Sequence, residues 1–382
     1  MAGNGKRGVG RMIAGLRQAA RAVLRRPPSD WAGPDAARAA ILRASPVEAD
    51  NRFDVVCLPG GQESAALRRL TSEGHRVLFP AAADLSFASL DRARRDLGLG
   101  ATVSIVPDPS WRALAERFRD ERGWPAVERP EGLERAFPLL SVVIVTWNNR
   151  EMNRLCLESL FARTEWPNLE VVVVDNGSSD GTPELLNALT GRHPNLRLLA
   201  LPENRGFPAA CNAGLAMASG EYLCLLNNDT VVTRGWAAAL AAHLVRHPRL
   251  GLVGPVTNAI ANEARIDVGY GNLDELPAWS RAWVREHDGE AFEIPMLAFF
   301  CVLTRREVFA AVGPLDERFG TGMFEDGDYN RRVRAAGFEV RCARDAFVHH
   351  WQKASFRQLG KEAYFRLYEE NRRKYEDKWG EK

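Results

Sequence analysis

The chain has 382 residues, of which 46% are hydrophobic and 26% charged, and its formal net charge is +2. These values are typical of a soluble globular protein with one large domain or two ordinary ones. A net charge this small argues against a general nucleic-acid binder. No apolar stretch approaches the roughly 18 residues that a membrane-spanning helix needs, and no secretion signal is evident. We therefore expect neither an integral membrane protein nor a secreted one.

The six cysteines favour a reducing compartment. They form no CxxC pair, and several lie inside apolar runs, where a free thiol behaves as a small core residue. Disulfides are rare in cytoplasmic proteins. We therefore expect reduced core thiols in a cytoplasmic protein, at Cys57, Cys156, Cys211, Cys224, Cys301 and Cys342.

Residues 1–49 are predicted to form a basic tail and linker. Residues 6–26 carry lysine and arginine but no acid, and apolar residues recur at helical spacing between them until Pro27 and Pro28 end the pattern. A basic amphipathic helix of this kind can lie on an anionic membrane surface. The alternative, a tail that folds only in part, stays open because the alanine-rich apolar face is small.

Residues 50–137 alternate short strand and helix signals, which predicts a Rossmann-like half-domain. Strands are expected at 53–58, 75–79 and 102–106, with helices near 63–73, 87–97 and 111–122. The pair Gly60 and Gly61 follows the first strand but lacks the GxGxxG spacing of a dinucleotide site. We therefore expect a structural or docking domain without chemistry of its own.

Residues 138–382 show a second, longer α/β alternation that ends in a charged amphipathic helix. Strands are expected at 141–146, 169–174, 196–201, 222–227 and 251–256. Helices are expected near 150–162, 181–190, 207–218, 234–247 and 361–378. This order predicts a sheet that is largely parallel and flanked by helices.

Carboxylates follow two of these predicted strands. Asp175 ends the run Val171–Val174, and Asp229 follows the run that ends at Leu226. In an open α/β sheet, ligands bind outside the carboxyl ends of the parallel strands. Carboxylates would be costly there without partners. The two acids are therefore expected to face one binding site.

The motifs of this second region occur in a specific order. They lie at 143–149, 174–182, 203–207, 212–214, 226–229, 313–319 and 324–328. In order and spacing the set resembles the family 2 glycosyltransferases over about residues 138–356. The resemblance implies an inverting nucleotide-sugar enzyme. It also implies an α/β GT-A fold, a mixed sheet flanked by helices, here preceded by the Rossmann-like half-domain.

The resemblance places donor binding in the loops after the strands. Asp175 would accept the imide N–H of a uracil or thymine ring, a role that suits a carboxylate. The loop 176–180 either contacts the ribose or serves only as a strand-to-helix turn. The residues assigned to the nucleotide sugar are Thr146, Trp147, Asn148, Asp175, Asn204, Gly206, Asn212, Asn227 and Asn228.

The resemblance also implies a divalent cation, Mn²⁺ or Mg²⁺, at Asp229. The first acid of the family's DxD motif is replaced by Asn227, but one carboxylate can suffice when diphosphate oxygens and water complete the site. His350, five residues before Ser355, is the implied second protein ligand, with His349 as the alternative. A helix-capping Asp229 and a merely hydrogen-bonded histidine are the structural readings of the same residues.

The general base is assigned to Asp326, in the pair Glu325-Asp326 at the start of a predicted helix. Such a carboxylate could remove the proton from an acceptor hydroxyl during a single inverting displacement. Glu325 is the second catalytic candidate, through acceptor binding. Asp328 is expected instead to pair with Arg331 or Arg332 and to complement the positive helix N-terminus.

These assignments predict an inverting, metal-dependent glycosyltransferase that uses a nucleoside diphosphate sugar and an acceptor hydroxyl. A glycan or lipid-linked acceptor, cell-envelope polysaccharide assembly and a cytoplasmic location, peripheral on the membrane through residues 6–26, follow by family analogy. One rival is a sugar-nucleotide pyrophosphorylase, but the loop 146–150 lacks the glycines that such an enzyme needs. The other is a non-catalytic nucleotide-sugar-binding or scaffold protein, favoured by the missing first acid.

Overall fold

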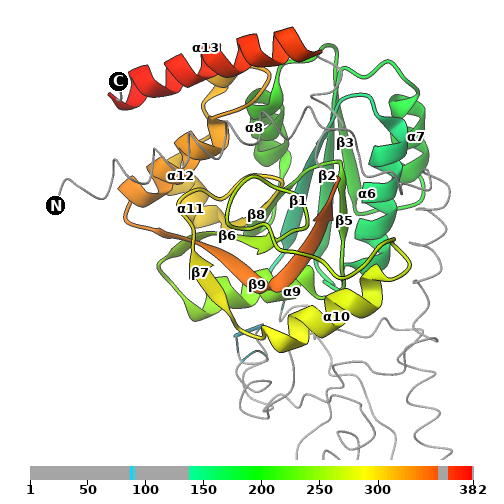
Figure 1. Cartoon of the computed structure of the whole chain (residues 1–382). Helices are drawn as coiled ribbons and strands as arrows, with labels where there is room; N and C mark the ends of the chain where they lie inside the picture. Colours follow the sequence, from blue (N-terminus) through cyan, green and yellow to red (C-terminus); the bar gives the residue numbers. More distant parts are fainter. Residues whose placement is uncertain (1–86, 89–90, 92–136, 352–359, 381–382) are drawn as a thin grey trace, which may run out of the picture.

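The computed structural model describes residues 87, 88, 91, 137–351 and 360–380 (Figure 1). The tail 1–49 and nearly all of the region 50–137 lie outside the described residues. The basic amphipathic helix and the Rossmann-like half-domain therefore stay predictions.

Strands and helices alternate in the described chain as far as the sixth strand, except that the fourth and fifth strands follow each other directly. It runs β1 (Leu140–Thr146), α6 (Arg150–Arg163), β2 (Leu169–Asn176), α7 (Thr182–Thr190), β3 (Leu196–Leu201), α8 (Phe207–Met217), β4 (Tyr222–Leu226), β5 (Thr230–Val232), α9 (Trp236–Arg246) and β6 (Leu250–Val256). The predicted elements of this part are confirmed, with bounds that differ by at most two residues.

The second half of the chain is less regular. It runs α10 (Leu276–Glu286), β7 (Ala291–Glu293), β8 (Cys301–Arg305), α11 (Arg306–Val312), the 3₁₀ helix η3 (Glu317–Phe319), α12 (Glu325–Ala335), β9 (Glu339–His350) and α13 (Lys361–Trp379). The predicted C-terminal helix is confirmed as α13. Tyr364, Tyr368 and Tyr375 of this helix are buried.

The strands of the described residues belong to one mixed sheet with the order β3-β2-β1-β4-β8-β6-β9-β5, and β7 pairs with β9 beside this path (Figure 1). β1 pairs in parallel with both β2 and β4. β8 runs antiparallel between β4 and β6, whereas β6 and β9 are parallel. A mixed sheet flanked by helices is the class that the resemblance implied, so the predicted GT-A fold class is confirmed for this part of the chain.

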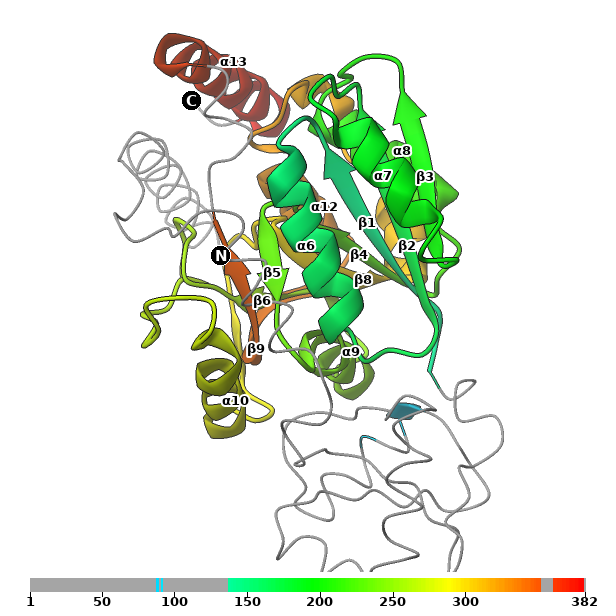
Figure 2. The ribbon, with the colours of Figure 1, turned by 90° about the vertical axis from the view of Figure 1, so that its right-hand side faces the viewer.

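Helices cover both faces of the sheet because alternate strand residues point to opposite sides (Figure 2). Val142 and Ile144 of β1 face a core shared with α6, α7 and α9. Val143, between them, faces a second core shared with α8 and α12. Continuous valine runs therefore occur in the central strands, which are buried on both faces.

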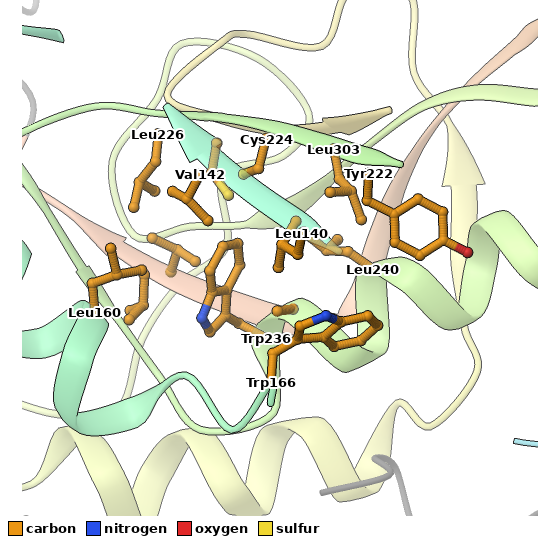
Figure 3. Close-up of a cluster of buried hydrophobic side chains, with 14 of the residues drawn as sticks. Leu140, Val142, Leu160, Trp166, Tyr222, Cys224, Leu226, Trp236, Leu240 and Leu303 are labelled. Carbon is orange, nitrogen blue, oxygen red and sulfur yellow. The ribbon is translucent and has the colours of Figure 1, made fainter. Parts of the chain in front are cut away.

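Aromatic side chains fill the first core. Trp166 and Trp236 lie beneath Leu140, Val142 and Leu226 (Figure 3). The indole N–H of Trp166 donates to the carbonyl of Pro138 at 2.8 Å, so burial leaves no unpaired donor there.

The expectation of core thiols is confirmed at Cys156, Cys211, Cys224, Cys301 and Cys342, which are all buried. Among the described residues, no helix combines the length and apolar character needed to span a bilayer.

Candidate active site

The predicted donor residues lie at the carboxyl edge of the parallel strands. Thr146 and Asp175 are register partners at the ends of β1 and β2. β4, on the other side of β1, leads into Asn227, Asn228 and Asp229. The structure therefore brings Asp175 and Asp229 to the same edge of the sheet, on strands that flank β1. Asp175 is 4% exposed and accepts the backbone N–H of Ser178 at 3.2 Å.

Asn148 joins the loops that follow β1 and β2. Its backbone N–H donates to the Ser178 hydroxyl at 2.7 Å, and its side-chain oxygen accepts the N–H of Ser179 at 2.8 Å. Asp180 accepts the N–H of Arg150 at 3.0 Å. The loop 176–180 therefore acts as a structural turn, and the Asn148 side chain braces it.

Asn153, which sequence reasoning missed, lies fully buried at the centre of this edge. Its amide donates to the carbonyl of Asn148 at 2.9 Å and to the Thr182 hydroxyl at 3.1 Å. Its oxygen accepts from the amide of Asn228 at 2.6 Å. One side chain of α6 thus ties together the loops after β1, β2 and β4. An asparagine on the packed face of a helix was the available signal, because buried amides need partners.

Asn204 and Gly206 form a second polar group after β3. The side-chain oxygen of Asn204 accepts from the amide of Asn176 at 3.0 Å and from the N–H of Gly206 at 2.9 Å. Gly206 has φ +86°, and a Cβ there would lie 2.1 Å from the carbonyl oxygen of Gly320. Only glycine allows this backbone approach. The loop after β3 therefore packs directly on the segment that precedes Glu325.

Asn212 lies on α8 and is engaged by the same later segment. Its amide donates to the carbonyl of Leu315 at 2.9 Å and to Glu317 at 3.0 Å, while its oxygen accepts the N–H of Leu315 at 2.8 Å. These bonds occupy both ends of the amide. The structure thus links Asn212 to the chain leading to Asp326.

Asp229 and His350 face each other across the β5–β9 pair, in which Thr230 and His350 are register partners. The Nδ1 of His350 lies 2.9 Å from the carbonyl oxygen of Ala259. Because a carbonyl only accepts, Nδ1 donates this hydrogen bond. Nε2 of the same ring lies 3.3 Å from Asp229 Oδ1.

Asp229 Oδ1 and His350 Nε2 lie close enough for both to bind one divalent cation. Asp229 and His350 are both buried, and an oxygen and an imidazole nitrogen are suitable ligands for Mn²⁺. No group of three or more acids, histidines or cysteines with the geometry of a metal site occurs among the described residues. The pair could therefore hold a divalent cation only with further ligands from diphosphate oxygens and water.

The structure distinguishes His349 from His350, because neighbouring strand residues point to opposite faces. The ring of His350 stacks on Phe300, whereas Nδ1 of His349 lies 2.6 Å from the hydroxyl of Tyr270. Burial, together with the neighbouring His350, lowers the pKa of His349 to about 3. His349 is therefore a neutral ring, and His350 is the one that faces Asp229.

Glu325 and Asp326 begin α12. Glu325 is buried and its Oε2 has no hydrogen-bond partner, whereas Asp326 is partly buried and accepts the N–H of Gly327 at 2.7 Å. Burial raises the pKa of both carboxyl groups, and the charge of Asp326 raises that of Glu325 further. A carboxylate with a raised pKa is a stronger base, which suits proton abstraction from a hydroxyl.

Asp328 behaves as predicted, with Arg332 as its partner. Asp328 is fully buried and accepts from Arg332 Nε at 2.9 Å. The expected pairing within α12 is therefore confirmed, and Asp328 has a structural role. Asn330 connects the same helix to the segment between β7 and β8 through hydrogen bonds with the N–H and the carbonyl of Leu297 at 3.0 and 2.8 Å.

Comparison with known proteins gives consistent matches. The sequence pattern of glycosyl transferase family 2 matches residues 141–313. An L-rhamnosyltransferase of Mycobacterium tuberculosis that acts on N-acetylglucosaminyl-diphospho-decaprenol is 32% identical over 225 residues, which cover 52% of this chain and 72% of the relative. The O-antigen biosynthesis protein RfbC of Myxococcus xanthus is 29% identical over 287 residues, 68% of this chain and 21% of its own length.

A further relative is much longer than this chain, and a solved structure shows a more distant similarity. Protein y4gI of Sinorhizobium fredii is 30% identical over 68% of this chain, which spans only 28% of that relative. The mannosyltransferase PcManGT of Pyrobaculum calidifontis, solved with GDP-Man and Mn²⁺, matches with a TM-score of 0.44 and 21% identity over 63% of this chain and 64% of its own. The identity to the rhamnosyltransferase over most of that protein, together with the family pattern, shows that the chain belongs to glycosyl transferase family 2.

Proposed function

We propose that this protein is an inverting, metal-dependent glycosyltransferase that moves a sugar from a nucleoside diphosphate to an acceptor hydroxyl. The observation that carries the proposal is the Asp229–His350 pair, in which Nε2 of the imidazole and a carboxylate oxygen lie 3.3 Å apart. This pair lies at the strand edge that also carries Asp175. Membership of glycosyl transferase family 2 supports the same activity.

Each side chain has a separate task in this proposal. Asp175 binds the base of the nucleotide. The loops after β1, β2 and β4, which are joined by hydrogen bonds, form the surface that contacts the donor. Asp229 and His350 would hold Mn²⁺ or Mg²⁺, which would supply Lewis acidity that neutralises charge on the departing diphosphate. Asp326 takes the proton of the acceptor hydroxyl as that oxygen attacks the anomeric carbon from the face opposite the diphosphate. A single displacement of this kind inverts the anomeric configuration.

The acceptor is proposed to be a glycan or lipid-linked saccharide of the cell envelope. Two relatives support this class, since one is named for O-antigen biosynthesis and the other for rhamnosyl transfer to a decaprenol-linked sugar. A cytoplasmic location, with the basic segment 6–26 on the inner membrane surface, would place the enzyme beside such an acceptor.

A donor screen with matched metal-site variants tests the proposal. The purified chain should be stabilised against heat by one nucleoside diphosphate sugar in the presence of Mn²⁺, because a ligand that binds only the folded state raises the melting temperature. Asp229→Ala should abolish both this metal-dependent stabilisation and sugar transfer while leaving the melting temperature of the free protein nearly unchanged. Full turnover in excess chelator would contradict the metal's role. Donor binding without transfer or hydrolysis would favour the scaffold alternative.

A further inference from the structure

The segment directly before the proposed base has an unusual backbone. We call residues 319–324 the base loop, because it leads into Glu325 and Asp326. Positive φ angles occur at Gly320, Gly322, Met323 and Phe324, with values of 58°, 133°, 80° and 71°. Methionine and phenylalanine rarely adopt left-handed conformations, which persist only where the surroundings impose them. Something outside the base loop must therefore hold it.

One side chain of α13 bonds to this loop at three points. The amide nitrogen of Asn371 donates to the carbonyl oxygens of Phe319, Gly322 and Met323 at 2.7, 2.8 and 3.4 Å. Asn371 is 0% exposed. Its side-chain oxygen accepts from Lys374 Nζ at 3.1 Å, so the amide orientation follows from its partners.

The chemistry of this contact selects asparagine. Its amide offers two N–H groups to the carbonyls on one side and an acceptor to the ammonium group on the other. Aspartate has nearly the same shape, but it lacks the N–H donors and would place a carboxylate against the carbonyl oxygens. The substitution Asn371→Asp therefore removes the hydrogen bonds to the loop while it keeps the size of the side chain nearly unchanged.

The rest of α13 holds the residues on either side of the base loop. Lys378 Nζ lies 2.6 Å from both Asp316, which precedes the loop, and Asp328, which follows it. The indole N–H of Trp379 also donates to Asp328, at 3.1 Å. Figure 1 shows α13 lying above α12. α13 therefore binds the chain on both sides of the base loop, at Asp316 before it and at Asp328 in the first turn of α12.

We propose that Asn371 is a positioning residue for the transfer reaction. Through the base loop it sets the place of Asp326, so that a helix remote in sequence from the donor-binding motifs determines the geometry of proton abstraction. The inference rests on the proposed function, because it needs Asp326 to act as the base. It assigns Asn371 no contact with the donor or the cation.

The test compares Asn371→Asp with Arg373→Ala, an exposed position on the same helix. Asn371→Asp should lower kcat by about 10²-fold, the cost of displacing a catalytic group by roughly 1 Å, while the KM for the donor stays within about twofold of wild type. Hydrogen exchange of the free protein should speed up at the amides of residues 320–328. Arg373→Ala should change neither quantity. Asn371→Ala, which buries no charge, replaces the aspartate variant if that chain does not fold.

The outcomes separate this inference from the proposed function. Normal kcat for the Asn371 variants in an enzyme that transfers sugar overturns the positioning role and leaves the function intact. Equal losses in kcat and in metal-dependent donor stabilisation also overturn it, because they indicate general unfolding. If the wild-type chain transfers no sugar with any donor, both proposals fail. Faster exchange in residues 320–328 with a loss confined to kcat supports the inference.

Discussion

Asp326 and Glu325 are neighbours in sequence, but their surroundings give them different tasks. Asp326 is partly buried and held by the N–H of Gly327, whereas Glu325 is buried with one oxygen that lacks a hydrogen-bond partner. The charge of Asp326 adds to burial in raising the pKa of Glu325. Two adjacent carboxyl groups whose pKa values are pushed apart can act as an ionised base and a protonated neighbour.

Replacement of the proposed base by its amide should slow turnover strongly without loss of donor binding. Asp326→Asn retains size and much of the hydrogen bonding but cannot accept the acceptor's proton, so we expect kcat to fall by about 10²–10⁴. Metal-dependent stabilisation by the donor should persist. Steady-state kinetics and thermal shifts measure the two effects. If Asp326→Asn turns over normally while Glu325→Gln is inactive, Glu325 is the base.

The pH profile should report the same carboxylate. A base must be deprotonated to act, so kcat/KM should rise with pH through the pKa of Asp326 in the free enzyme. Burial raises that pKa, so the acid limb should lie above the value of about 3.9 typical of an exposed aspartate. Glu325→Gln should keep the limb above the ordinary value, because burial raises this pKa without the neighbouring carboxyl group. A limb at or below the ordinary value would argue against a buried base.

At the scale of elements, the donor side and the base side of the site meet at a contact between two loops. Gly206, which precedes α8, packs against the backbone of Gly320 in the base loop. Asn212 of α8 binds Leu315 and Glu317 one turn before that loop. The start of α8 thus supports the segment that leads to Asp326, and its position depends on the absence of a side chain at residue 206.

A methyl group at Gly206 should be more damaging than one at Gly313. Both glycines have φ +86°, but nothing lies within 4 Å of a Cβ at Gly313, whereas one at Gly206 overlaps the Gly320 carbonyl. Gly313→Ala should lower the free energy of unfolding by about 1–3 kcal/mol, the cost of that backbone conformation. Gly206→Ala should lower it by roughly a further 1–3 kcal/mol through overpacking. Denaturant titrations measure the difference, and equal losses would show that the loop yields to the methyl group.

At the scale of the whole molecule, the few described residues before the transferase part contact its core. Phe87 packs against Phe137 and Trp166, with ring centroids 5.3 and 5.0 Å apart. Asp91 receives two hydrogen bonds from Arg246 of α9, at 2.9 and 2.7 Å. A buried, bidentate pair of this kind fixes orientation as well as proximity. Phe87 and Asp91 are therefore attached to the first core, on the face that carries α9.

The basic segment offers a prediction for the intact chain. Deletion of residues 1–28 should weaken binding to vesicles that contain anionic lipid, because it removes basic charge without removing an acid. Activity on a soluble acceptor should change little, since the proposed site residues all lie after residue 145. Vesicle co-sedimentation at low and high salt measures the effect. Equal binding by both chains would indicate a tail without a membrane role.

Local sequence pattern determined much of the secondary structure of this protein and several of its candidate site residues. Valine and leucine runs, separated by helical spacing, predicted β1 to β4, β6 and α6 to α9 almost to the residue, because burial on both faces of a parallel sheet leaves such a signal. Acids that follow those runs marked Asp175 and Asp229, and the ordered motifs indicated the family. These features are readable because each depends on residues close together in the chain.

Tertiary structure alone decided which polar groups meet. β5 and β7 have only three residues each, and β8 and β9 pair with strands distant in sequence. No local hydrophobic periodicity therefore predicted these four strands. Only the β5–β9 pairing turns His350 rather than His349 towards Asp229. Asn153 and Asn371 look like ordinary helix residues until folding buries them against carbonyl oxygens. A buried amide acquires its role from partners that can lie 50 or more residues away, and the need to satisfy those hydrogen bonds acts only once the chain has folded.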